Sequence, residues 1–202
     1  DLDGHKAVRI CEVVNPEAAP FGLADRHGSV SKRELNYWWR HRAIPASRAQ
    51  VRRLLENLHL ESTLELAEKS FGLSLSDRYW LNDASDPKTW DAINFFDNDF
   101  TDDLGFLTLG QDSAGSSPDA PDYARMSLSS PNSTLGGDLL KKWKIIDGRR
   151  VLLKAGVGLA NQEPYNEVVA TELHRRLMEP GEFVPYWLFE DGRRTYSACG
   201  NM

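Results

Sequence analysis

The stretch LLKKWKIIDGRRVLLKAG, from Leu139 to Gly156, decides the fold predicted for this chain. Two apolar, strand-like runs flank Asp147-Gly148, a dipeptide that favours a two-residue β-hairpin turn. The second run places Lys154 at the end of an apolar strand. Ten residues later, Pro164 is suited to the first turn of a helix, and Glu167 lies close to that helix start. The pattern predicts a small antiparallel sheet with one long helix, as part of an α+β fold.

The flanking segments complete this prediction. MSLSS (Met126–Ser130) has the pattern of a further strand, and PNSTLGG (Pro131–Gly137) has the composition of a flexible polar turn. The predicted helix carries an apolar face that is expected to pack against the sheet. That face consists of Val168, Val169, Leu173 and Leu177.

The same segment contains the parts of a phosphate-binding site. Gly136 and Gly137 would let backbone N–H groups approach an anion, and Lys154 would supply a positive charge on a long side chain. Glu167 would hold that ammonium group in place. Two simpler interpretations stay open. Lys154 is also compatible with a solvent-facing lysine at a strand end, and Glu167 with a carboxylate that complements the helix dipole.

The chain resembles the N-terminal lobe of HipA-like serine/threonine kinases, the toxin kinases of bacterial persistence modules. The resemblance rests on an ordered set of segments: SPNSTLGGDLLKKW, VLLKAG, QEPYNEVVATELHRRL (Gln162–Leu177), and VPYWL followed by TYSACGNM. FGLSLSDRYWLN (Phe71–Asn82) and WDAINFFDNDF (Trp90–Phe100) are similar to the segment before the kinase loop in a HipA-like subfamily. The resemblance implies a cytoplasmic bacterial transferase with ATP as its cofactor, contacted by Gly136, Gly137, Lys154 and Glu167.

The resemblance also implies a regulatory site and partners. HipA-like kinases carry an autophosphorylated serine in the loop before the lysine strand. The candidates here are Ser129, Ser130, Ser133 and Thr134. The simpler alternative is that these hydroxyls bond their own backbone in a turn. The implied partners are ATP and a C-lobe or an antitoxin-like protein, and the implied Mg²⁺ would be held by the C-lobe.

A kinase further needs a catalytic aspartate and metal ligands, in HxD…N and DFG-type elements. No HxD follows Lys154, and Asp99-Phe100 precedes it and continues with Thr101. We therefore expect a kinase N-lobe without catalytic activity of its own, either truncated or a natural split protein. The expected organisation is an N-terminal helical and irregular subdomain at 1–109, a linker at 110–122 and the kinase-like N-lobe at 123–202.

Composition limits the other classes of function. The net charge of −6 and the pI near 5.4 argue against non-specific nucleic-acid binding. Cys11 and Cys199 form no CxxC and are expected to be buried or partly buried thiols. The five histidines lack metal-ligand spacing, so no metal site is expected. The sequence has no membrane-length apolar run, and no signal peptide is expected.

Capping signals predict three helices in the N-terminal half. The capping pairs are Ser31 with Glu34, Ser47 with Gln50, and Ser62 with Glu65, and Gly72 suits the C′ position of the third helix. VRICEVV (Val8–Val14) is predicted to be a strand.

Basic residues cluster in this helical block, at Arg40, Arg42, Arg48, Arg52 and Arg53. A solvated face, a helix-turn-helix-like DNA contact and partner docking are all compatible with this cluster. The alternative function is therefore a DNA-binding or protein-docking regulatory module of toxin–antitoxin type, although direct DNA contact is not expected.

The stretch from Asp77 to Asp122 is acidic, with eleven aspartates against Arg78 and Lys88. EF-hand spacing is missing, so turn formation explains most of these aspartates better than calcium binding. Aromatic residues alternate with the acids and are expected to anchor this irregular stretch to a core. They are Trp80, Trp90, Phe95, Phe96 and Phe100.

Overall fold

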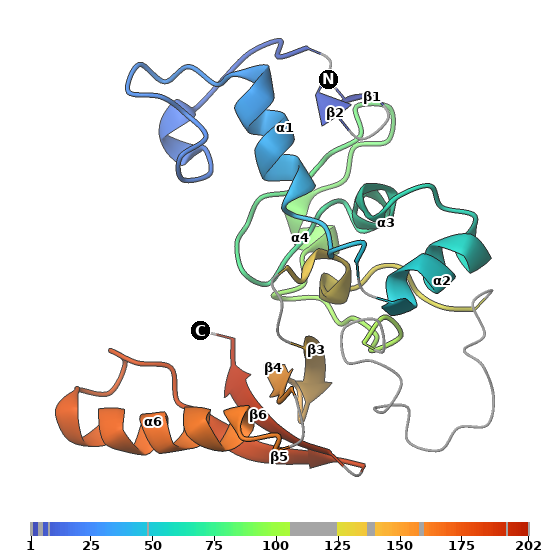
Figure 1. Ribbon diagram of the computed structural model, residues 1–202. Helices are drawn as coiled ribbons and strands as arrows, with labels where there is room; N and C mark the ends of the chain where they lie inside the picture. Colours follow the sequence, from blue (N-terminus) through green and yellow to red (C-terminus); the bar gives the residue numbers. More distant parts are fainter. Residues whose placement is uncertain are drawn as a thin grey trace.

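The computed structural model describes residues 2–3, 6–7, 9–47, 49–105, 125–136, 140–157, 160–192 and 194–201. Within them, short helices dominate the N-terminal half, and the C-terminal half is a four-stranded antiparallel sheet along which one long helix runs (Figure 1). The fold is α+β, as the sequence predicted. None of the described helices is both long enough and apolar enough to cross a membrane.

The sheet consists of β3 (Lys141–Ile146), β4 (Arg149–Ala155), β5 (Trp187–Asp191) and β6 (Arg194–Gly200). Their spatial order is β3-β4-β6-β5, and every neighbouring pair is antiparallel. The predicted turn joins β3 to β4. Asp147 and Gly148 both have positive φ angles there, 50° and 73°, as a type I′ hairpin turn requires.

The strand predicted at Met126–Ser130 does not form, and this segment is irregular. The Ser127 N–H donates to the Asp103 carboxylate at 2.8 Å, while Met126 and Leu128 pack against the helical part of the core. A side chain, not a neighbouring strand, therefore satisfies the Ser127 N–H, and the strand-like pattern was misleading.

Helix α6 (Glu163–Leu177) packs against β6, β5 and β4. The predicted apolar face does not point toward the sheet. Val169, Leu173 and Leu177 are exposed, and Val168 is half-buried. The prediction of a helix was correct, but the prediction of its buried face was wrong.

The side of α6 that faces the sheet is largely polar. Glu167 bonds Lys154 of β4, and the Thr171 hydroxyl accepts the Tyr186 N–H at 2.9 Å, just before β5. Because these polar groups have partners on the sheet, they take the inner side of the helix and turn the apolar row outward.

Helices α1 (Lys32–Arg40), α2 (Ala49–Leu58) and α3 (Thr63–Lys69) form the N-terminal block. The predicted capping box at α1 is complete, with Ser31 and Glu34 each accepting the other's backbone N–H. At α3, Ser62 accepts the Glu65 N–H at 3.2 Å, but the Glu65 carboxylate bonds the Glu61 N–H instead. The Ser47–Gln50 pair predicted for α2 lies partly outside the described side chains.

Helix α3 ends in a Schellman motif. The Gly72 N–H donates to the Ala67 carbonyl at 2.8 Å, and the Phe71 N–H donates to the Glu68 carbonyl at 2.9 Å. Phe71, with φ 55°, therefore occupies the C′ position that the sequence assigned to Gly72. Gly72 is required for packing as well, because a Cβ there would lie 2.7 Å from the Trp39 ring.

The N-terminus forms a short hairpin of β1 (Leu2–Asp3) and β2 (Lys6–Ala7). The strand predicted at Val8–Val14 is wrong for its described part, because Arg9–Val14 is irregular and exposed or half-buried. Cys11 is exposed, contrary to expectation, whereas Cys199 is buried. A 3₁₀ helix, η1 (Pro16–Ala18), follows.

One core cluster joins the two halves of the chain. It buries Leu73, Leu75 and Phe95 of the N-terminal half together with Leu135 and Trp143 of the C-terminal half. Against it pack the aromatic residues Phe71, Trp80, Trp90, Phe96 and Phe100, so the acidic stretch, including α4 (Trp90–Ile93), is anchored as predicted. The predicted linker at 110–122 lies outside the described residues.

The described aspartates of that stretch take part in turns and ion pairs. Asp77 and Asp83 each accept the backbone N–H two residues ahead, which is the predicted turn chemistry. Asp102 instead accepts the Lys142 ammonium at 2.9 Å. Among the described residues, no group of three His, Cys, Asp or Glu side chains could hold a metal ion.

Candidate functional site

Lys154 lies on β4 and points toward α6. Its ammonium group donates to the Glu167 carboxylate at 2.9 Å and to the Tyr186 hydroxyl at 2.6 Å. Burial lowers the pKa of Lys154, but its hydrogen bonds and charge interactions with Tyr186 and Glu167 outweigh this, and the pKa lies above its ordinary value. Lys154 is therefore protonated at neutral pH and held in a defined position between a strand and a helix.

Tyr186 is a contact of Lys154 that the sequence did not reveal, because it is distant from Lys154 along the chain. Its backbone N–H is bonded to Thr171 of α6, and its hydroxyl interacts with the Cys199 thiol of β6. Burial raises the pKa of Tyr186, and Lys154 opposes that shift without cancelling it. Tyr186 thus links α6, β4 and β6 as a neutral hydroxyl.

Ser197 is paired with Lys154 in the register of β4 and β6, so both side chains lie on the face that α6 covers. The Ser197 side chain is buried, and its hydroxyl has no hydrogen-bond partner among the described residues. A buried hydroxyl without a partner is unusual in a folded protein. The face around Lys154 therefore has unused hydrogen-bonding capacity.

Leu140, directly before β3, lies next to the end of β4 that carries Lys154. The Leu140 carbonyl accepts the Ala155 N–H at 2.8 Å, directly after Lys154 on β4. Gly136 is half-buried, and among the described residues a Cβ there would meet only the His41 carbonyl, at 3.8 Å. Gly137 lies outside the described residues. The predicted approach of these glycines to a phosphate stays a prediction.

The segment expected to be a flexible turn is a buried 3₁₀ helix, η3 (Pro131–Thr134). Asn132 fixes it to β3, because its side-chain amide accepts the Trp143 N–H at 2.7 Å and donates to the Trp143 carbonyl at 3.2 Å. The expectation of flexibility was therefore wrong for the described part of the segment.

The four candidate phosphorylation residues differ in access. The hydroxyl of Ser133 bonds the Ser130 carbonyl and the Ser70 hydroxyl, and that of Thr134 donates to the Leu73 carbonyl at 2.8 Å. Ser130 is also buried, whereas Ser129 is exposed. Modification of Ser130, Ser133 or Thr134 would require η3 to leave its position. The autophosphorylation role stays a prediction.

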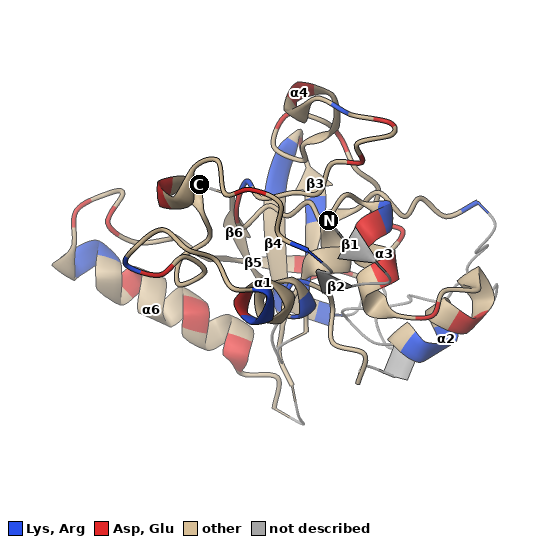
Figure 2. Cartoon of the chain, turned by 90° about the horizontal axis from the view of Figure 1, so that it is seen from above, with Lys and Arg blue, Asp and Glu red and all other residues tan. Residues whose placement is uncertain are grey.

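The structure gives the basic residues of the helical block different roles. Arg42 is buried and forms a two-point ion pair with Asp77, at 2.7 Å and 2.8 Å. Arg40, Arg52 and Arg53 are exposed, and Arg48 lies outside the described residues. Helix α2 carries Glu56 besides Arg52 and Arg53, so its surface is not uniformly basic (Figure 2). Arg42 is therefore structural and not available to DNA.

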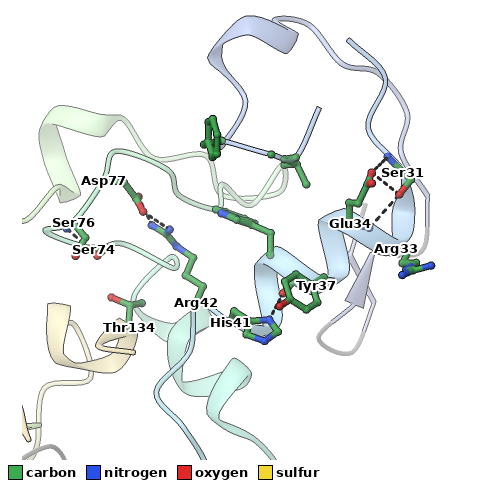
Figure 3. Close-up of a pocket in the computed structure, with 14 residues that line it drawn as sticks. Ser31, Arg33, Glu34, Tyr37, His41, Arg42, Ser74, Ser76, Asp77 and Thr134 are labelled. Carbon is green, nitrogen blue, oxygen red and sulfur yellow. Dashed lines mark hydrogen bonds and ion pairs between the residues drawn. The ribbon is translucent and has the colours of Figure 1, made fainter. Parts of the chain in front are cut away.

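A pocket of about 800 Å³ lies between α1 and the segment around Asp77, and the sequence did not predict it. Figure 3 shows Tyr37 of α1 and the following His41 on one wall and Ser74, Ser76 and the Arg42–Asp77 pair on another. Tyr37 and His41 stack with their ring centroids 4.0 Å apart. The three adjacent aromatic residues of α1 were the only sequence signal, and they do not show which ring faces outward.

Comparison with protein-family models, curated proteins and solved structures found no match. The geometry around Lys154 is therefore the basis for a functional proposal.

Proposed function

We propose that this chain binds the phosphates of ATP through Lys154, as the small lobe of a HipA-like serine/threonine kinase. The observation that supports this most directly is the Lys154–Glu167 ion pair, which joins a strand of an antiparallel sheet to the helix that packs on it. In protein kinases a strand lysine pairs with a helix glutamate and with the nucleotide phosphates.

The electrostatics of Lys154 suit this role. An ammonium group has three N–H donors, and Glu167 and Tyr186 accept two of them among the described residues. One donor is left for a phosphate oxygen without loss of either protein partner. Since the Lys154 side chain retains 22% of its exposure, a ligand can reach it.

Binding does not imply phosphoryl transfer by this chain. Transfer needs a catalytic aspartate and metal ligands, and the sequence has no HxD after Lys154. We expect nucleotide binding with no turnover of ATP above the uncatalysed rate, in a cytosolic setting where ATP is available. Labelled ATP incubated with the chain and a generic protein acceptor would measure this, and clear transfer would contradict it.

The proposal is tested by titrating the 202-residue chain with ATP in a calorimeter, with ADP and AMP for comparison. Lys154→Ala should abolish the binding that depends on the phosphates, while the unfolding temperature stays near that of the unchanged chain. Lys88→Ala is the matched control, because Lys88 is in an exposed ion pair with Asp86 and lies outside the site. Equal ATP affinity in Lys154→Ala and the unchanged chain would refute the proposal.

The alternative, a DNA-binding or protein-docking module, has less support in its DNA-binding form. Because Arg42 is paired with Asp77, the helical block has one fewer cation available to contact DNA phosphates. The exposed face of α6 is more informative about docking.

A further inference from the structure

The outer face of α6 presents a continuous apolar row to solvent. Tyr165, Val169, Leu173 and Leu177 repeat every four residues and are exposed by 48%, 68%, 54% and 70%. Residues four apart lie side by side on a helix, so these side chains form one ridge. A contiguous exposed apolar surface of this kind is an interaction site more often than other parts of a protein surface are.

The charges beside this ridge are mixed in sign. On α6 the acidic residues precede His174, and His174, Arg175 and Arg176 form the last turn. Figure 2 shows the blue residues at one end of α6 and the red residues along the remainder. A uniformly acidic or uniformly basic partner would meet repulsion at one end of this helix, whereas a helix with the same charges in reverse order would not.

A second copy of α6 in antiparallel orientation has that reverse order. Two identical helices related by a twofold axis and packed antiparallel bring the same edge of each helix together. Glu172 and Arg176 share one edge, where the Arg176 guanidinium donates to the Glu172 carbonyl. In the antiparallel pair, Glu172 of each copy faces Arg176 of the other, while the two apolar ridges pack against each other.

We propose that the outer face of α6 is a homodimer interface, in which two copies of this chain pack their α6 helices antiparallel around Leu173. Ridges of residues spaced by four pack at a crossing angle of about −50°, which concentrates the contact near the middle of the ridge. A helix of this length spans about 22 Å, so the interface is small and the dimer is weak and in rapid exchange. Lys154 and Glu167 lie on the opposite side of α6, so this inference does not depend on nucleotide binding.

The test is sedimentation velocity over a concentration series that reaches the millimolar range. The unchanged chain should shift from 22.8 kDa toward twice that mass as concentration rises. Leu173→Asp should stay monomeric throughout, and its far-UV circular dichroism should be unchanged because Leu173 is exposed. Val14→Asp is the matched control, since Val14 is an exposed apolar residue outside α6, and it should dimerise normally.

A charge-exchange experiment tests the orientation. Glu172→Arg alone and Arg176→Glu alone each place like charges together, so both variants should be monomeric where the unchanged chain dimerises. An equimolar mixture of the two variants should dimerise again, because opposite charges then meet at both contacts. A monomer at every concentration, or a dimer that persists in Leu173→Asp, would overturn the interface. A mixture that stays monomeric would overturn the antiparallel arrangement.

Discussion

Replacing Arg42 should destabilise the fold more than replacing any other arginine of the helical block. Arg42 is 7% exposed and has four hydrogen bonds: two to the Asp77 carboxylate and one each to the Gly72 and Tyr79 carbonyls. The guanidinium also lies 5.1 Å from the Trp38 ring. In Arg42→Ala, the carboxylate and both carbonyls lose the guanidinium together, and the carboxylate keeps its bond from the Tyr79 N–H.

The expected cost follows from these contacts. Removing one partner of a buried ion pair costs about 3–5 kcal/mol. The Asp77 side chain keeps 31% exposure, so water can solvate it in part, and the lower end of about 3 kcal/mol applies. For a chain of this size, that corresponds to a fall in the unfolding temperature of about 6–12 °C. Arg42→Lys should recover little, because an ammonium group cannot bond both carboxylate oxygens and both carbonyls.

Urea unfolding followed by tryptophan fluorescence measures this cost, with an unchanged m-value showing that only stability has changed. Arg40→Ala is the control, since Arg40 is exposed at the end of α1, two residues before Arg42, and should change stability by less than about 0.5 kcal/mol. The double variant Arg42→Ala/Asp77→Ala should be less destabilised than the sum of the single variants. A loss below about 1 kcal/mol in Arg42→Ala would refute the structural role and return Arg42 to the set of candidate ligand contacts.

Three further predictions concern the site, the basic helices and acid stability. Glu167→Gln should weaken ATP binding less than Lys154→Ala does, because the amide keeps an acceptor for the ammonium but loses the charge, and calorimetric titration of both variants would show the order. Duplex DNA binding should be weak at physiological salt, and a salt-titrated mobility shift showing tight, sequence-dependent binding would contradict this. Burial tends to raise the pKa of Asp191, but bonds and charges from Lys144 and Lys142 outweigh it, and the pKa lies below the ordinary 3.8. Asp191 therefore stabilises the fold above that pH and loses this contribution as the pH falls through its lowered pKa, so the stability deficit of Asp191→Asn should shrink in acid unfolding below pH 3.8.

The sequence predicted those features whose causes are local. Asp147-Gly148 specifies its own turn through backbone conformation, and the hairpin then places Lys154 on β4. Pro164 predicted the start of α6 to within one residue, which brought Glu167 opposite Lys154. Each step depends on neighbours along the chain, so periodicity and turn chemistry were sufficient.

The sequence-based predictions failed for features that depend on contacts between residues distant along the chain. An apolar row on a helix usually faces the core, but on α6 the polar row that includes Glu167 and Thr171 has partners on Lys154 and Tyr186. Sequence alone could not pair Thr171 with the Tyr186 backbone, so it could not show that the polar side was the inner one. The pocket beside α1 was missed for the same reason, since one of its walls comes from a segment more than thirty residues away, which Arg42 holds through Asp77.

The buried 3₁₀ helix η3 is hydrogen-bonded to both halves of the molecule and directly precedes the segment that contains Gly136 and Gly137. Toward the N-terminal half of the chain, the Ser133 carbonyl accepts the Ile44 N–H at 3.1 Å, and the Ser133 hydroxyl bonds the Ser70 hydroxyl. On the sheet side, Asn132 bonds both backbone groups of Trp143. Gly136 follows within two residues of η3, so the helical block fixes one end of the loop, and the Leu140–Ala155 hydrogen bond fixes the other end beside Lys154. If phosphates bind at this loop, the N-terminal half is the support that sets its distance from Lys154, and a change that loosens η3 should act on the same site as a change at Lys154 itself.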